Sequence, residues 1–117
     1  MAVKRIVSNI QVSDIAAAKK FYNEILGLEV LMDHGWIITY GVSDLSSVQL
    51  SFATEGGSGT KVPDLSIEVD NLLQVYQAMK EAGFIISYDL TTEPWGVKRF
   101  YVLDPFGKTI NILSHVR

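Results

Sequence analysis

The sequence predicts an α+β fold in which a strand–helix–strand–strand–strand unit occurs twice. The first observation is a repeated junction, in which a strand ending in valine meets a helix-capping pair, at Val12–Asp14 and again at Val69–Asn71. The second is a glycine after each predicted helix: Gly27 and Gly83 lie 56 positions apart. We therefore expect paired βαβββ units, each with one helix packed on one face of a four-stranded sheet.

The length and composition agree with one globular domain over residues 1–117, with repeats at 1–53 and 62–117 and a Gly-rich connection at 54–61. The chain is 48% hydrophobic and 20% charged, ordinary values for a soluble protein, and it has no cysteine, which excludes disulfides and thiolate sites. The formal net charge of −3 and the absence of a basic stripe argue against nucleic acid and anionic membranes as partners. With no secretory signal and no long apolar run, we expect a cytoplasmic protein.

The first repeat begins with alternating apolar residues and continues with a helix. The Ser13–Asp14 pair offers side-chain oxygens to the free amides of the first helical turn, and Gly27 suits the left-handed conformation that ends a helix. The predicted elements are a strand at Lys4–Val12, a helix from Asp14 to about Leu26, strands at Leu28–Met32, Trp36–Gly41 and Val48–Phe52, and a polar loop at Val42–Ser47.

The second repeat follows Ala53–Thr60, a glycine-rich segment that we interpret as a mobile loop or linker. The helix has its apolar side at Leu72, Val75, Tyr76 and Met79. The predicted elements are a strand at Leu65–Val69, a helix at Leu72–Ala82, a strand at Phe84–Tyr88, a loop at Asp89–Gly96 and a closing hairpin at Arg99–Leu103 and Lys108–Leu113.

The closing hairpin contains the residue on which the functional question largely depends. Its turn, Asp104–Gly107, combines a proline that fixes φ with a glycine that tolerates positive φ. In the strand that follows, Ile110 and Ile112 point to one face, and Asn111 lies on the other. A polar side chain therefore occupies a defined face of a strand.

Two segments resemble the vicinal oxygen chelate superfamily, which includes glyoxalase I, bleomycin-resistance proteins and extradiol dioxygenases. Val12–Val30 is similar to its "VxD…FYxxxLGL" pattern, and Glu93–Leu113 to its "WGxxxFxxxDPxGxxI" pattern. The resemblance implies paired βαβββ units that form a curved half-barrel sheet around a cavity, often in dimers. Among these proteins, the bleomycin-resistance branch is the most similar.

The resemblance also implies where a catalytic metal would be bound in this family. The corresponding positions here are Val7, Gln49, Asp64 and Asn111, with at most one carboxylate and no histidine. Hard cations prefer several anionic oxygens or imidazoles, so we expect no metal and no cofactor. The same positions argue against an enzyme, although they leave the question open.

Several polar residues have an ordinary structural interpretation beside a functional one. Asp64 is either a buried general base or a turn residue, and Glu68 on the same face is a second candidate acid. His34 suits a solvated turn. His115 either faces the cavity, since it shares strand parity with Asn111, or belongs to a frayed terminus.

Aromatic and amide side chains are the other candidates for ligand binding. Trp95 suits a cavity rim or an interface, and Arg99 either holds a carboxylate or is a solvated edge residue. The complete predicted ligand-binding set is Val7, Asn9, Gln11, Trp36, Tyr40, Gln49, Asp64, Trp95, Arg99, Tyr101 and Asn111.

These observations favour metal-free binding of a small organic molecule, with sequestration as the use that the resemblance implies. The alternative is a lyase, isomerase or dioxygenase of the glyoxalase type, with a metal or with acid–base work by Asp64 and Glu68. A third possibility is a structural role of the surface alone. We expect a homodimer, formed either side by side or by exchange of units through Gly56–Gly59.

Overall fold

The computed structural model describes residues 3–43 and 45–116, with the backbone alone at residues 45–47. Over these residues the chain forms eight strands and three helical segments, which confirms the α+β class. In order they are β1 (Val3–Gln11), η1 (Ile15–Ala17), η2 (Lys19–Ile25), β2 (Glu29–Asp33), β3 (Ile37–Val42), β4 (Leu45–Ala53), β5 (Leu65–Val69), α1 (Leu72–Glu81), β6 (Ile86–Thr92), β7 (Val97–Leu103) and β8 (Thr109–His115).

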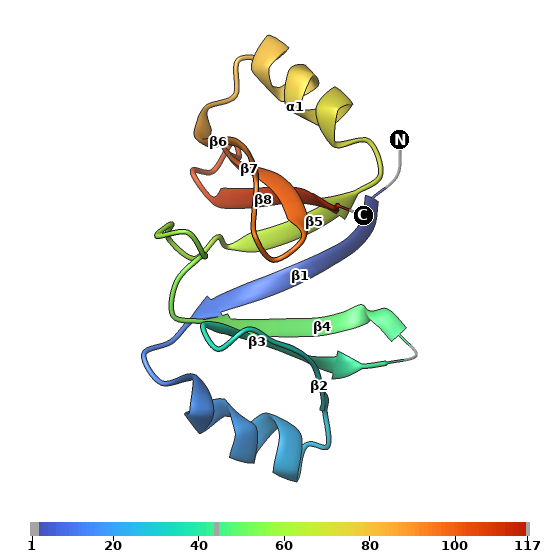
Figure 1. Ribbon diagram of the computed structural model, residues 1–117, viewed down its shortest axis with the longest axis vertical. Coiled ribbons are helices and arrows are strands. Elements are labelled where there is room, and N and C mark those ends of the chain that lie inside the picture. The colour runs from blue at the N-terminus through green and yellow to red at the C-terminus, as the bar shows by residue number, and fades with distance from the viewer. Residues whose placement is uncertain (1–2, 44, 117) are drawn as a thin grey trace. The chain divides into compact units, whose positions relative to one another are not determined.

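The chain divides into two compact units. The first unit is Val7–Val62, and the second unit joins the start of β1, up to Ile6, to the chain from Pro63 onward. Both contain a helical segment and strands in the predicted βαβββ order (Figure 1). That the units form a single domain stays a prediction.

The second unit contains a sheet with the order β5-β8-β7-β6, in which β5 and β8 are parallel and the other pairs antiparallel. The predicted hairpin turn is confirmed between β7 and β8. Asp104 Oδ1 accepts hydrogen bonds of 2.9 Å from the backbone N–H groups of both Phe106 and Lys108, and Gly107 has a φ of 78°. The turn chemistry thus fixes the register that places Asn111 opposite Tyr101.

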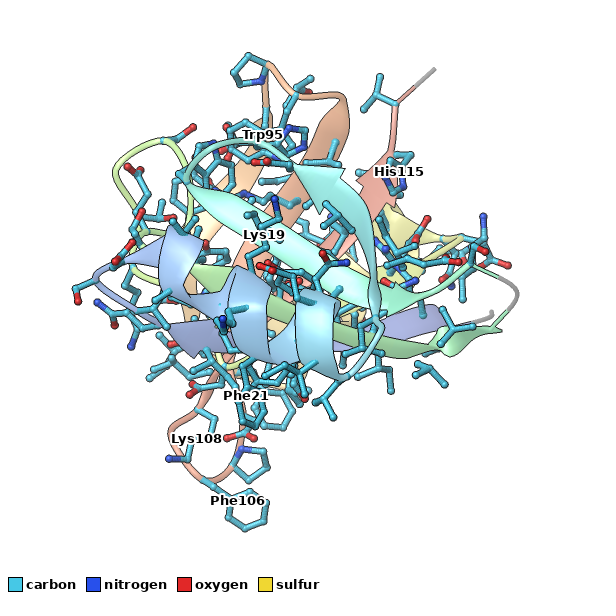
Figure 2. All side chains as sticks on the ribbon, turned by 90° about the horizontal axis from the view of Figure 1, so that it is seen from below. Lys19, Phe21, Trp95, Phe106, Lys108 and His115 are labelled. Carbon is cyan, nitrogen blue, oxygen red and sulfur yellow. The ribbon has the colours of Figure 1, made fainter. Side chains whose placement is uncertain are left out.

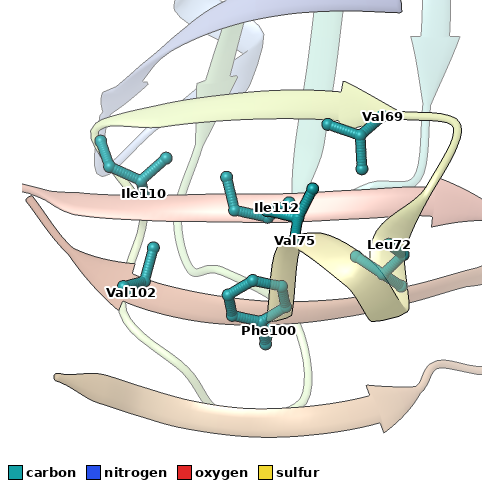
Figure 3. Close-up of a cluster of buried hydrophobic side chains, with 7 residues drawn as sticks. All are labelled: Val69, Leu72, Val75, Phe100, Val102, Ile110 and Ile112. Atoms are coloured by element: carbon teal, nitrogen blue, oxygen red, sulfur yellow. The ribbon is translucent and has the colours of Figure 1, made fainter. Parts of the chain in front are cut away.

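The helix α1 covers one face of this sheet (Figure 1). Leu72 and Val75 are buried, and Tyr76 and Met79 pack beside them, so the predicted apolar side of the helix is confirmed. Burying each large apolar side chain contributes about 1.5–3 kcal/mol. The buried cluster in Figure 3 consists of Val69, Leu72, Val75, Phe100, Val102, Ile110 and Ile112.

The first unit contains strands in the order β2-β3-β4-β1, with β1 parallel to β4. Its helix begins at the predicted cap, where Asp14 Oδ1 accepts from Ala16 N–H at 3.1 Å. It is not a regular α-helix, however. A 3₁₀ turn, η1, precedes the π-helix η2, and Leu26 N–H donates to Phe21 O, five residues back, at 3.1 Å. Apolar spacing alone does not distinguish these helix types.

Two predicted boundaries are wrong, because strand pairing extends into polar sequence. The predicted loop Val42–Ser47 already contains the beginning of β4 at Leu45, although Asp44 lies outside the described residues. The predicted strand Phe84–Tyr88 and loop Asp89–Gly96 are replaced by β6, which continues to Thr92. Pairing of β6 with β7 supplies hydrogen-bond partners there, and register shifts on both sides of Tyr88 take up the irregular spacing.

The glycine-rich connection forms a hydrogen-bonded turn. Gly56 N–H donates to Thr60 O at 2.8 Å, and Thr60 N–H returns a bond to Gly57 O at 3.0 Å. The turn requires positive φ at three successive residues, Gly57 to Gly59, which explains the glycines. The segment is therefore a built turn in this structure and not an extended linker. No helix among the described residues has the length and hydropathy needed to cross a membrane.

Candidate functional site

The two faces of the second unit's sheet differ in chemistry. One face packs against α1, and alternation places the remaining side chains of β7 and β8 on the opposite face. We call it the face opposite α1. Polar and aromatic side chains are buried on it, which is unusual without specific partners. Its buried members on β7 and β8 are Val97, Arg99, Tyr101, Thr109, Asn111 and Leu113.

Asn111 lies in the middle of this face and is only 7% exposed. Its Nδ2 donates to Ser66 Oγ at 3.0 Å, from the neighbouring position on β5. Its Oδ1 is buried, and none of the described residues donates a hydrogen bond to it. An unsatisfied buried oxygen costs roughly 1–3 kcal/mol, so this atom is a position where a bound donor would be stabilising.

Thr109 and Asp64 form the next row along β8. Thr109 N–H donates to Asp64 Oδ2 at 2.8 Å, and Asp64 N–H donates to Thr109 O at 2.9 Å. Asp64 is exposed, so its interpretation as a buried base is wrong. Its carboxylate instead holds the beginning of β5 against β8 through the hydrogen bond from Thr109 N–H. The hydroxyl of Thr109 is buried and, among the described residues, has no hydrogen-bond partner.

Arg99 is buried, which contradicts the solvated-edge interpretation. It is 3% exposed, and its Nε donates to Glu93 Oε2 at 2.7 Å. Tyr88 OH donates to the same carboxylate oxygen at 2.9 Å, and Arg99 Nη1 donates to Tyr101 OH at 3.1 Å. The guanidinium carbon lies 5.3, 5.0 and 5.0 Å from the ring centroids of Tyr88, Trp95 and Tyr101. We call these five residues the arginine cage; it compensates a buried charge with an ion pair and π faces.

A second charged group lies at the far end of the face opposite α1. Glu68 contacts Arg5 Nε through Oε1 at 3.1 Å and His115 Nδ1 through Oε2 at 2.9 Å. His115 is the last residue of β8, and Val116 N–H donates to Gly96 O at 2.8 Å, so β8 is hydrogen-bonded to its end and not frayed.

The first unit places its predicted site residues on different faces. Asn9 lies opposite Ser51, where Thr39 Oγ1 and Ser51 Oγ share a 2.7 Å hydrogen bond, and Gln49 lies two residues away on the same face. Val7 is buried, and Gln11 is exposed. The structure thus brings polar side chains together here too, on strands β1, β3 and β4.

Tyr40 is a correction. It is 1% exposed and packs under η2, with ring centroids 6.2 Å from Tyr22 and 6.0 Å from Phe52. It belongs to the helix-covered core and not to the face that bears Asn9. Burial and the nearby charge of Asp33 raise the pKa of its phenol.

The remaining aromatic candidate of the first unit, Trp36, is half-buried. Its ring stacks on the exposed His34 at a centroid distance of 6.1 Å. This contact gives His34 a partner within its own turn.

The family's metal positions do not fit a divalent cation. Val7 has no donor atom, Asp64 is exposed with one oxygen engaged by backbone, and the amide of Asn111 is oriented by Ser66. Within the described ranges no group of three or more His, Cys, Asp or Glu side chains is arranged to hold a metal. We therefore derive no step through a metal.

In the clusters of the second unit, sequence reasoning missed five residues: Arg5, Ser66, Tyr88, Glu93 and Thr109. The alternation of side chains between the two faces of a strand could have identified two of these residues. Ser66 shares strand parity with Asp64 and Glu68, and Thr109 shares it with Asn111. Glu93 had no periodic signal, because it precedes β7 in a loop.

Comparison with known proteins identifies relatives of the whole chain. The family model of the Glyoxalase/Bleomycin resistance protein/Dioxygenase superfamily matches residues 3–112. Similar solved structures include a member of this superfamily from Vibrio splendidus 12B01, with 18% identity, coverage of 94% of this chain and 97% of that chain, and a TM-score of 0.65.

Two further similar structures have named activities. They are methylmalonyl-CoA epimerase from Mycobacterium tuberculosis, with 15% identity, coverage of 98% and 90%, and a TM-score of 0.71, and the 2,3-dioxygenase LapB from Pseudomonas sp. KL28, with 17% identity, coverage of 98% and 42%, and a TM-score of 0.66. No curated protein matches the chain. At these identities the likeness concerns the fold.

Proposed function

Because this chain belongs to the Glyoxalase/Bleomycin resistance protein/Dioxygenase superfamily, we propose that it binds a small organic molecule without a metal, on the face opposite α1 of the second unit. The observation that carries this proposal is the buried Oδ1 of Asn111, which no described residue satisfies. Native proteins satisfy nearly all buried polar atoms, so this oxygen is a position at which a donor from outside the described residues would be stabilising. A ligand N–H or O–H group would supply it.

The surroundings of Asn111 support a ligand that is neutral and partly aromatic. Ser66 fixes the amide orientation by accepting from Nδ2, so Oδ1 has a defined direction. Thr109 adds a second buried oxygen, its hydroxyl, two residues away on the same strand. Tyr101, opposite Asn111, provides apolar ring surface. Fixed polar atoms on an apolar background are typical of small-molecule sites.

We propose sequestration as the use of this binding, in a cytoplasmic homodimer. Apolar side chains on and just after η2 support a partner surface, because Phe21, Ile25 and Leu26 are 57%, 69% and 58% exposed. A second copy of the chain is the partner that we propose for them. Light scattering during size-exclusion chromatography tests the dimer.

The alternative is an enzyme of the glyoxalase type, in keeping with the epimerase and dioxygenase that share its fold. Metal analysis of the purified protein distinguishes the two. One divalent ion per chain would contradict the metal-free proposal, and turnover assays with acyl-CoA and thiol-adduct substrates should then follow.

The binding proposal is tested by native mass spectrometry and by thermal shift against a library of neutral aromatic compounds. We expect a retained or added organic mass and a raised melting temperature for some compounds. Asn111→Leu should abolish the shift, whereas Gln77→Leu, the same change on the exposed side of α1, should keep it. A shift that survives in Asn111→Leu would contradict the proposed site.

A further inference from the structure

The carboxylate of Glu68 orients the ring of His115. The ring contacts this carboxylate through Nδ1 at 2.9 Å, and Arg5 Nε lies 3.1 Å from the other oxygen. An ionised carboxylate can only accept, so Nδ1 carries the hydrogen and Nε2 bears the lone pair of the neutral ring. A histidine held in this way by a carboxylate is arranged to accept a proton at Nε2.

His115 is also accessible, unlike its partner Glu68. Its side chain is 57% exposed, whereas that of Glu68 is 12% exposed. The hydrogen bond of the ring to Glu68 uses Nδ1 and not Nε2. The imidazole is therefore the accessible member of this pair.

The loop that carries Trp95 is fixed beside His115. Val97 lies opposite His115 in the β7–β8 register, and Val116 N–H donates to Gly96 O at 2.8 Å. Figure 2 shows Trp95 and His115 on the same side of the second unit. The half-buried indole lies 5.0 Å from the guanidinium of Arg99, and this cation–π contact orients its ring.

From this arrangement we propose that His115 is the proton acceptor for an aromatic hydroxyl compound bound beside Trp95; the inference rests on the proposed binding function. The O–H bond of the ligand breaks, an N–H bond forms at His115 Nε2, and the ligand is held as its phenolate. The carboxylate of Glu68 contacts the resulting imidazolium through one oxygen and Arg5 of β1 through the other. From β7 the facing residue is the uncharged Val97. No oxidant, reductant or further reactant is needed.

The test uses 4-nitrophenol, whose ionised form absorbs visible light, at a mildly acidic pH where the free compound is mostly neutral. We expect wild-type protein to raise the phenolate absorbance to a plateau. His115→Gln should lose this rise completely, and Glu68→Gln should lower it. His34→Gln is the matched control, because His34 is the other histidine of the chain, and it should behave as wild type.

Binding and proton transfer are measured separately. Quenching of tryptophan fluorescence in a Trp36→Phe background reports binding beside Trp95, the remaining tryptophan. Nitrogen NMR of the imidazole rings reports the tautomer, for which we expect hydrogen on Nδ1 of His115 and mixed tautomers after Glu68→Gln.

Four results would overturn the inference. They are quenching without an absorbance rise, a rise that persists in His115→Gln, hydrogen on Nε2 of neutral His115 in the wild type, and no binding of 4-nitrophenol at all. If the last result came with thermal stabilisation by other library compounds, the proposed binding function would stand while the role of His115 would fall.

Discussion

The two units repeat the same order of elements, yet their helices bury different amounts of apolar surface. In the second unit α1 is a regular α-helix that buries Leu72 and Val75 against the sheet. In the first unit η2 is a π-helix with no buried residue, and Phe21 on it is 57% exposed. The π-helix instead places the half-buried Tyr22 beside Phe52, at a ring-centroid distance of 4.7 Å.

This difference shows that a repeated sequence pattern determines the order of the helices and strands but not which side chains are buried on their faces. The second unit has a closed apolar core on one face and the arginine cage on the other. The first unit has a buried hydroxyl pair, Thr39 and Ser51, on the face that bears Asn9. We therefore expect substitutions in the core under α1 to lower stability more than substitutions of the exposed side chains on η2, which belong to the proposed partner surface.

The largest change in stability is expected for the buried Phe100 of the second unit, and a much smaller one for the exposed Phe21 of the first unit. Phe100 is fully buried, so Phe100→Ala removes its packing and leaves a cavity, and the free energy of unfolding should fall by about 3–5 kcal/mol. Phe21→Ala at an exposed site should change it by about 0.5 kcal/mol or less. Urea denaturation of both variants measures this difference.

The dependence of these stabilities on protein concentration tests whether Phe21 lies in a dimer interface. If Phe21 lies in such an interface, the loss of unfolding free energy caused by Phe21→Ala should grow as the protein concentration rises. Equal costs for Phe21→Ala and Phe100→Ala in dilute protein would contradict the proposed division of stability.

The next largest loss of stability is expected when the ion pair of the arginine cage is removed. Glu93→Gln leaves the buried guanidinium of Arg99 without its counter-charge, and the unfolding free energy should fall by about 3–5 kcal/mol, as is typical when one partner of a buried pair is removed. Glu24→Gln on the exposed side of η2 is the matched control and should change little. The double variant Arg99→Leu/Glu93→Leu should recover much of the loss, whereas a double variant as unstable as Glu93→Gln would argue against this account.

Much of the fold follows from the sequence, because the deciding signals are local. The cap at Asp14, the turn at Asp104–Gly107 and the apolar side of α1 each depend on residues a few positions apart. The helix type of η2 and the extent of β6 depend on tertiary packing and strand pairing, which local patterns do not record.

The candidate site was predictable only where alternation places a side chain on a face. Asn111 was found in this way, and His115 was recognised on the same strand face without its partner. The pairing of Glu93 with Arg99 joins a loop to a strand, and the pairing of Glu68 with His115 joins residues 47 positions apart. Neither has a periodic signal, so the burial of Arg99 became apparent only in three dimensions.

A smaller effect compares the buried tyrosine of each unit. Tyr101 OH accepts from Arg99 Nη1, so Tyr101→Phe should cost about 1–2 kcal/mol by leaving a charged donor less satisfied. Tyr40 OH is buried, and no partner for it exists among the described residues, so Tyr40→Phe should be neutral or raise stability by up to about 1 kcal/mol. Thermal unfolding followed by circular dichroism measures both. The comparison fails if Tyr40→Phe is the more destabilising variant.

The smallest effect concerns the bond that ties α1 to β6 at the edge of the second unit. Tyr76 OH donates to Asp89 Oδ1 at 2.5 Å, which lowers the pKa of Asp89 and raises that of Tyr76. Because the carboxylate pKa is lower in the folded state, its stabilisation is present above the unfolded value and lost as the pH falls through the folded value. Because the phenol pKa is higher in the folded state, the stabilisation by this group is lost as the pH rises through the folded-state pKa of Tyr76.

The melting-temperature difference between wild type and Tyr76→Phe, measured across pH, reads out this bond directly. It should be widest near neutral pH and narrow toward both acid and strong alkali. The control is Tyr88→Phe, whose lost bond is to Glu93 inside the arginine cage, and its difference should not follow the titration of Asp89. A difference for Tyr76→Phe that stays constant from neutral to acidic pH would mean that the hydrogen bond contributes nothing to holding α1 against β6.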